Sequence, residues 1–134
     1  MNVAEILTSL RSKGLRTSKT RKAMLDIFSS AHGPIDAHVL LDKLRVNKTT
    51  IYREITTLIQ EGILSEIDFG DGKKRYELAS LSHHHHLICT KCKTIEEYAV
   101  ETDLSTEESR IQKQHAFIVQ KHALEFFGVC KHCQ

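Results

Sequence analysis

The sequence lacks any long apolar segment and has little net charge. It contains no uninterrupted apolar run of about 18 residues, the length that a membrane-spanning helix needs. It also lacks the basic and then apolar leader of a secretory signal. These absences predict a cytoplasmic protein. A hydrophobic content of 40% is ordinary for a folded chain, so disorder is not expected.

Cysteine is scarce, but its spacing is informative. Cys89 and Cys92 form one Cys-x2-Cys pair, and Cys130 and Cys133 form a second. Cytosolic thiols stay reduced, so paired cysteines there indicate metal binding more often than disulfides. Four thiolates fill the tetrahedral shell of zinc and leave no open position. The sequence therefore predicts a structural zinc site.

The small net charge of +2 hides an uneven distribution of charged residues. Residues 1–76 contain 13 Lys and Arg against 9 Asp and Glu, whereas residues 77–134 contain 6 against 8. One segment has six basic residues and no acid: Arg11, Lys13, Arg16, Lys19, Arg21 and Lys22. Such a cluster suits contact with phosphates, although a solvated helix face is the alternative.

The first part of the chain has the apolar spacing of helices. A helical face is formed by Val3, Ile6, Leu7 and Leu10. Gly14 then ends this helix. Three further helices are predicted, with caps at Thr17 or Ser18, at Asp36 and at Asn47.

The period changes after Gly62, where the fourth predicted helix ends. Residues 63–69 and 73–78 alternate like two short strands, and Gly70-Asp71-Gly72 forms the turn between them. Helices followed by a hairpin with a basic tip describe a winged helix, whose last helix enters the DNA major groove. Polar residues on that helix suit phosphate or base contact, unless they form only a solvated face: Lys48, Thr49, Thr50, Tyr52 and Arg53.

The second part of the chain predicts strands around one helix. Ser105 and Glu108 match a capping box that opens a helix to about Gln114. Residues 117–119 and 124–129 are predicted strands. This segment is too small to depend on its own core, so metal or a second copy is the natural supplement. The predicted class is α+β, with a winged-helix domain at 1–78 and a metal-binding dimerisation domain at 79–134.

Four consecutive histidines precede the first cysteine pair. On a strand, His83 and His85 would face one side and His84 and His86 the other, so the run would serve two sites. Either Glu77 or Glu97 could complete the His84/His86 site with a carboxylate, and His122 with Glu101, Asp103 or Glu107 could join His83 and His85. Imidazole with carboxylate accepts zinc, iron(II), nickel or manganese. A tag remnant and a solvated polar strand are the alternatives.

These residues together resemble the ferric uptake regulator family of metal-responsive repressors. The resemblance rests on the following segments, which occur in the family's order: Gly14-Leu15-Arg16-Thr17, Thr49-Thr50-Ile51-Tyr52-Arg53, Arg75-Tyr76-Glu77-Leu78, His83 to Cys89 with Cys92, and His122-Ala123-Leu124 with Gly128, Cys130 and Cys133. It implies a structural zinc at Cys89, Cys92, Cys130 and Cys133. It also implies a regulatory site at Glu77, His84, His86 and Glu97, and a further site at His83, His85 and His122.

The same resemblance implies DNA contacts near Arg16 and at Tyr52 and Arg53. Thr17 and Arg21, in the basic segment, complete the candidate set. The leading hypothesis is a homodimeric repressor of metal-homeostasis genes that binds operator DNA when zinc or iron(II) is bound. The alternatives are a zinc-stabilised DNA-binding protein without sensing and, with little support, a hydrolytic metalloenzyme.

Overall fold

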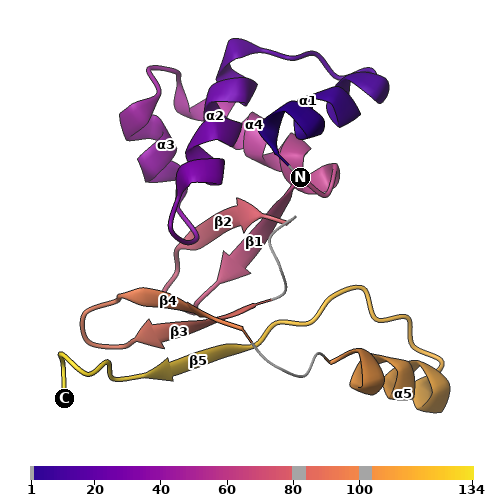
Figure 1. Cartoon of the computed structure of the whole chain (residues 1–134), viewed down its shortest axis with the longest axis vertical. Helices are drawn as coiled ribbons and strands as arrows, with labels where there is room; N and C mark the ends of the chain where they lie inside the picture. The colour runs from indigo at the N-terminus through magenta and orange to yellow at the C-terminus, as the bar shows by residue number, and fades with distance from the viewer. Residues whose placement is uncertain (1, 80–83, 100–103) are drawn as a thin grey trace. The chain divides into compact units, whose positions relative to one another are not determined.

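The computed structural model describes residues 2–79, 84–99 and 104–134. The chain divides into two compact units, Met1–Leu81 and Ser82–Gln134, which we call the N-terminal and C-terminal units. Figure 1 shows the order of the elements along the chain. No described helix is long and apolar enough to cross a membrane.

Four helices form most of the N-terminal unit. They are α1 (Val3–Ser12), α2 (Lys19–Ser30), α3 (Ala37–Lys43) and α4 (Lys48–Gln60). Each begins after a polar residue whose side chain accepts a backbone N–H of the first turn: Asn2, Ser18, Asp36 and Asn47. Such caps satisfy donors that the helix itself leaves unpaired. The predicted caps at Asp36 and Asn47 are therefore confirmed, and of the two candidates Thr17 and Ser18 the cap is Ser18.

One apolar core joins these helices. Its largest fully buried side chains are Ile6, Leu10, Met24, Leu25, Leu40, Ile51 and Leu58. Burial of each such side chain contributes about 1.5–3 kcal/mol relative to exposure. The core therefore requires every helix of the unit, since α1 to α4 all contribute to it.

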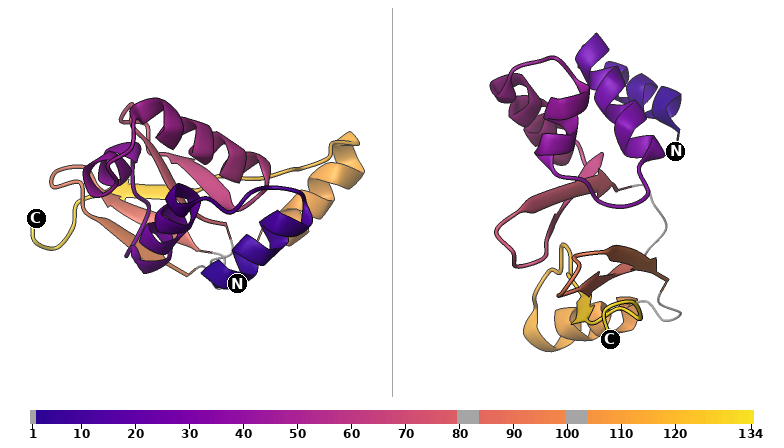
Figure 2. Two further views of the ribbon diagram at one scale, coloured as in Figure 1. Left: turned by 90° about the horizontal axis from the view of Figure 1, so that it is seen from above. Right: turned by 90° about the vertical axis from the view of Figure 1, so that its left-hand side faces the viewer.

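A β-hairpin completes this unit. Strands β1 (Leu64–Asp68) and β2 (Lys74–Leu78) pair antiparallel, with Leu64 opposite Leu78. A single bridge between Ile35 and Tyr76 ties the α2–α3 connection to β2. Figures 1 and 2 show the four helices gathered on one side of the hairpin. The arrangement is a winged helix, as the sequence predicts.

The C-terminal unit contains a three-stranded sheet and one helix. Strand β3 (His85–Cys89) lies between β4 (Ile95–Tyr98) and β5 (Glu125–Gly128). The β3–β4 pair is antiparallel and the β3–β5 pair is parallel. Helix α5 (Ser105–His115) lies in the crossover to β5 that a parallel pair needs.

Two local predictions for this unit are wrong. Ser105 is not the N-cap: it is the first helical residue, and the N-cap position is occupied by Leu104, whose side chain forms no capping hydrogen bond. Residues 117–119 form no strand and lie outside the three-stranded sheet, whose order is β4-β3-β5. Phe117 and Ile118 stay 60% and 76% exposed as a result.

Candidate metal centres and DNA-binding surface

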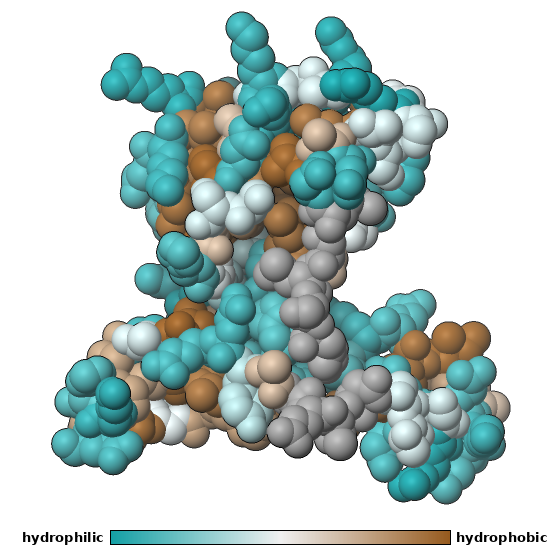
Figure 3. All heavy atoms as spheres, viewed as in Figure 1, coloured by the Kyte–Doolittle hydropathy of each residue, from teal (hydrophilic) through white to brown (hydrophobic). Residues whose placement is uncertain are grey.

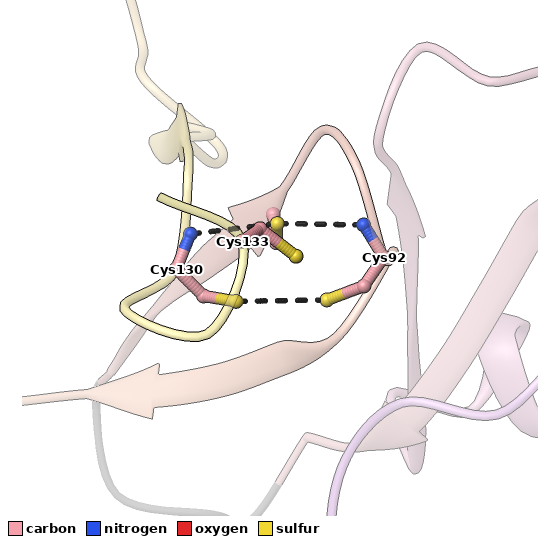
Figure 4. A group of neighbouring side chains, drawn as sticks. Cys92, Cys130 and Cys133 are labelled. Carbon is pink, nitrogen blue, oxygen red and sulfur yellow. Dashed lines mark hydrogen bonds between the residues drawn. The ribbon is translucent and has the colours of Figure 1, made fainter.

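The four cysteines come together at one end of the sheet. Cys89 ends β3 and Cys92 follows in the next turn, whereas Cys130 and Cys133 lie just after β5. Because β3 and β5 run parallel with Cys89 level with Gly128, both cysteine pairs reach the same edge. Their sulfurs all lie within 4.8 Å of one another, and Figure 4 shows three of these residues, Cys92, Cys130 and Cys133, gathered in one place.

The spacing of these sulfurs fits zinc. Cys92 Sγ and Cys130 Sγ are 3.7 Å apart. A tetrahedral zinc with sulfur at about 2.3 Å requires sulfur pairs separated by about 3.8 Å. All four cysteines are free thiols. The donor set and its geometry therefore match a closed structural zinc site.

The protein environment favours thiolate at two of these positions. Backbone N–H groups of Cys130 and Cys92 point at Cys89 Sγ, at 3.4 and 3.5 Å, and they lower the pKa of Cys89 to about 5. The Thr94 hydroxyl, 3.0 Å from Cys92 Sγ, lowers the pKa of Cys92. Cys133 differs, because its hydrogen bond with the Cys130 sulfur raises its pKa to about 12. A cation is needed to gather all four as thiolates.

The histidine run divides between two faces of the sheet. His85 and His86 are consecutive in β3 and are both buried. The rings of His84 and His86 lie 4.9 Å apart, whereas the ring of His85 lies 5.8 Å from that of His122. His83 falls outside the described residues. The observed alternation follows from the period of two along a strand.

Carboxylates flank His86 on both neighbouring strands. The register places Glu97 of β4 opposite His86, and Glu125 of β5 beside it on the other side. Residues at matched positions on adjacent strands project to the same face. Glu77 belongs to β2 of the N-terminal unit, opposite Ser65. Sequence reasoning missed Glu125, because only the pairing of β3 with β5 brings it to this position.

The other face carries His85, His122 and one acid. His85 Nδ1 lies 2.8 Å from the Leu124 carbonyl oxygen, which can only accept, so Nδ1 is the donor of this hydrogen bond. His122 Nδ1 lies 2.8 Å from Glu108 Oε1. The sequence predicted Glu108 as part of a capping box and offered Glu107 as one of three candidate acids here, but Glu107 pairs with Arg110 at 3.0 Å. Glu101 and Asp103 fall outside the described residues.

Helix α4 presents the predicted polar face to solvent. Ile51, Ile55 and Leu58 point into the core. The opposite side is exposed at Lys48, Thr49, Tyr52 and Arg53, and half-exposed at Thr50. The Lys48 ammonium lies 5.8 Å from the Tyr52 ring centre. These side chains are placed to meet a ligand that approaches the outer face of the helix.

In the loop before α2 and in the hairpin, fewer basic side chains are exposed and unpaired with acids than the sequence suggests. Arg16 and Thr17 are exposed, and Thr17 Oγ1 accepts a 2.8 Å hydrogen bond from Arg11. Arg21, a candidate DNA contact in the sequence, is buried and paired with Glu54.

The basic tip of the hairpin consists of Lys73, Lys74 and Arg75, and two of these three residues have acidic partners. Lys74 Nζ lies 3.4 Å from Glu66, and Arg75 forms two hydrogen bonds with Asp71. Lys73 remains an exposed cation near the turn.

Comparison with known proteins identifies the family. The model of the ferric uptake regulator family matches residues 12–127. The chain belongs to this family. The ferric uptake regulation protein of Bordetella parapertussis is 30% identical over 133 residues, which cover 95% of each chain. The peroxide-responsive repressor PerR of Staphylococcus aureus is also 30% identical, covering 97% of this chain and 90% of the relative.

A solved member of the ferric uptake regulator family has the same fold. The Helicobacter pylori ferric uptake regulator superposes with a TM-score of 0.77 at 24% identity, covering 98% of this chain and 91% of that chain. Family members are metal-responsive regulators. The sulfur cluster and the imidazole-rich faces described above fit a structural zinc and a second divalent metal.

Proposed function

We propose that this chain is a homodimeric, metal-dependent DNA-binding repressor that senses zinc or iron(II) and controls metal-homeostasis genes. The observation that carries the proposal is the division of one histidine run between two sheet faces, beside a four-sulfur cluster. A structural zinc needs only the four cysteines, so the additional imidazoles support further metal sites with another role. Equal identity to an iron regulator and to a peroxide-responsive repressor leaves the sensed signal to experiment.

Each metal site has its own proposed ligands. Cys89, Cys92, Cys130 and Cys133 would hold the structural zinc. The regulatory ion would be held by Glu77, His84, His86 and Glu97, and the further ion by His83, His85 and His122. Glu108 joins the further site, because its carboxylate lies 2.8 Å from His122. Such an ion would act as a Lewis acid and bond to imidazole nitrogens and carboxylate oxygens.

Sensing follows from linkage between the two units. Glu77 belongs to the N-terminal unit, whereas His84, His86 and Glu97 belong to the C-terminal unit. Residues of both units can ligate the same ion only in a restricted set of arrangements, so ligation shifts the population toward those arrangements. If DNA also prefers them, metal and DNA affinity rise together, typically by about 1–3 kcal/mol of coupling.

Dimerisation is supported by exposed apolar side chains of the C-terminal unit, some of which are visible in Figure 3. They are Tyr98, Ile111, Phe117, Ile118, Leu124, Phe126, Phe127 and Val129. A large exposed apolar surface marks an interaction site, and a second copy would cover it. Two winged helices would then contact half-sites about one helical turn apart.

The proposed DNA contacts lie on α4 and in the preceding loop. They are Arg16, Thr17, Lys48, Thr49, Thr50, Tyr52 and Arg53. Arginine and lysine can contact guanine or phosphate, threonine can donate to phosphate, and Tyr52 can lie against a thymine methyl. The exposure of these side chains opposite the core supports the assignment.

The deciding experiment measures DNA affinity across buffered concentrations of free zinc, iron(II) and manganese. The duplex is one that the wild-type protein enriches from a randomised pool. His84→Ala/His86→Ala should abolish the metal dependence while the zinc content at the cysteines persists. His38→Ala/His115→Ala is the matched control, since it removes two exposed imidazoles elsewhere. Unchanged metal dependence in the first variant would refute sensing and leave a zinc-stabilised DNA-binding protein.

A further inference from the structure

Arg21 is a buried cation within the N-terminal unit. It is 7% exposed and is the only buried charged residue apart from histidines among the residues that the structure describes. It lies in the first turn of α2, where its backbone N–H donates to the Ser18 cap at 3.0 Å. A buried guanidinium must be paired, because an unpaired one would lose its hydration without compensation.

The partner of Arg21 lies on the helix proposed to enter the DNA. Arg21 Nε donates to Glu54 Oε2 at 2.8 Å, and Nη2 donates to Glu54 Oε1 at 3.2 Å. This two-point geometry matches the planar guanidinium fork to the carboxylate and fixes orientation as well as distance. The Glu54 side chain is itself only 17% exposed. In α4 it directly follows Tyr52 and Arg53.

The remaining nitrogen of the Arg21 guanidinium, Nη1, binds the loop before α2. Arg21 Nη1 donates to the backbone carbonyl of Arg16. That loop carries the exposed Arg16 and Thr17 side chains. A single buried side chain thus connects two segments that are far apart in sequence, the Arg16 loop and α4, and both are proposed DNA contacts.

We propose that Arg21 and Glu54 are positioning residues for DNA binding, which fix the Arg16 loop in place relative to helix α4. The inference rests on the proposed DNA-binding function. Arg21 would not touch DNA. It would keep Arg16 and the α4 side chains at the separation of the DNA groups that they contact in the same duplex. DNA contacts displaced by even a small distance lose much of their value, because hydrogen bonds to base edges have narrow geometry.

A substitution that changes the charge of Glu54 distinguishes a positioning role of Arg21 from a direct contact of Arg21 with DNA. Glu54→Gln removes one negative charge, which on electrostatic grounds alone strengthens attraction to DNA. If Arg21 contacted phosphate, freeing it from Glu54 would also tighten binding. If the pair positions the loop, the same substitution weakens binding, because the glutamine NH₂ group cannot accept from the guanidinium. The two roles therefore predict changes of opposite sign.

Glu61→Gln is the matched control. Glu61 lies at the C-terminal end of the same helix, where it pairs with Lys13 at 3.1 Å on the exposed surface. This variant makes the same change in net charge without touching the Arg21 pair. Affinity is measured for metal-loaded protein with the duplex enriched by the wild type and with a random-sequence duplex.

We expect Glu54→Gln to weaken binding to the enriched duplex about tenfold or more, with no loss on the random duplex. Glu61→Gln should bind both as the wild type does or slightly tighter. Enriched-duplex binding by Glu54→Gln that equals or exceeds that of the wild type would overturn the proposal. If the wild type itself enriches no duplex, the proposed function fails, and this inference fails with it.

A second variant distinguishes loss of DNA positioning from loss of folding. Arg21→Met/Glu54→Leu replaces the pair with apolar side chains of similar size, which commonly preserves stability. It leaves the Arg16 carbonyl without its donor. We expect this variant to unfold at a temperature close to that of the wild type and to bind the enriched duplex about tenfold or more weakly. Wild-type affinity in this folded variant would also overturn the proposal.

Discussion

The two units hold themselves together by different means. The N-terminal unit buries apolar side chains from all four helices and the hairpin in one core. Among the described residues of the C-terminal unit, the buried ones are Ile88 and Cys89 with the two histidines His85 and His86. Helix α5, all of whose residues are described, buries none. One unit therefore depends on apolar packing, whereas the other has little core of its own, and we propose that bonds to metal and a partner surface supplement it.

Removal of the structural zinc should give the largest effect, because it should destabilise the C-terminal unit and leave the N-terminal unit folded. Cys92→Ser, or strong chelation, should unfold the C-terminal unit, because zinc on four thiolates contributes on the order of 10 kcal/mol or more to folding. The N-terminal unit should keep its structure, since its core contains no cysteine. Residue-resolved hydrogen exchange measures both units at once. Equal loss of protection in α1 to α4 would contradict this division.

Truncation of one apolar side chain in each unit should give an intermediate effect. Leu40 is 0% exposed in the N-terminal core, whereas Phe126 is 44% exposed on the C-terminal sheet. Leu40→Ala should lower the free energy of unfolding by about 2–5 kcal/mol, because it leaves a cavity.

Phe126→Ala should instead weaken self-association and change the stability of its own unit less. Denaturant unfolding and analytical ultracentrifugation separate the two outcomes. A dimer of unchanged affinity in Phe126→Ala would remove this residue from the proposed interface.

The smallest effect concerns a charge in the hairpin. The Arg75 guanidinium donates to Asp71 and lowers the pKa of this carboxyl from 3.8 to about 2. Because the folded pKa is depressed, the associated stability is present above about pH 4 and is lost as the pH falls through about 2.

Arg75→Gln should return the Asp71 pKa toward 3.8, as followed by carboxyl carbon NMR. Lys73→Gln, which leaves the ion pair intact, should not. An unchanged Asp71 pKa in Arg75→Gln would mean that another group stabilises the carboxylate.

Predictions from local sequence patterns agreed best with the structure in the N-terminal unit. Ser18, Asp36 and Asn47 cap helices because a side chain needs to reach only its own first turn. The same logic failed at Ser105, where the pattern of a capping box occurs one position inside the helix. The predicted strand at residues 117–119 was wrong for a different reason: a strand needs another strand to pair with, and no local pattern shows whether one is available.

Long-range partners explain the remaining differences. The basic segment suggested that Arg21 meets DNA, but Glu54, 33 residues further on, takes its guanidinium. Glu108 lies beside His122 only because α5 and the segment before β5 bring them together, 14 residues apart in sequence. Glu125 comes level with His86 through a parallel register that composition cannot reveal.

By itself, the sequence determined the metal-binding residue types, the alternation of the histidines and the amphipathic helices, because each depends on spacing within one strand, turn or helix. The tertiary structure decided which charges remain available to a ligand and which acids accompany each histidine. Those outcomes depend on contacts between distant segments, whose partners are chosen by the packing of the whole unit.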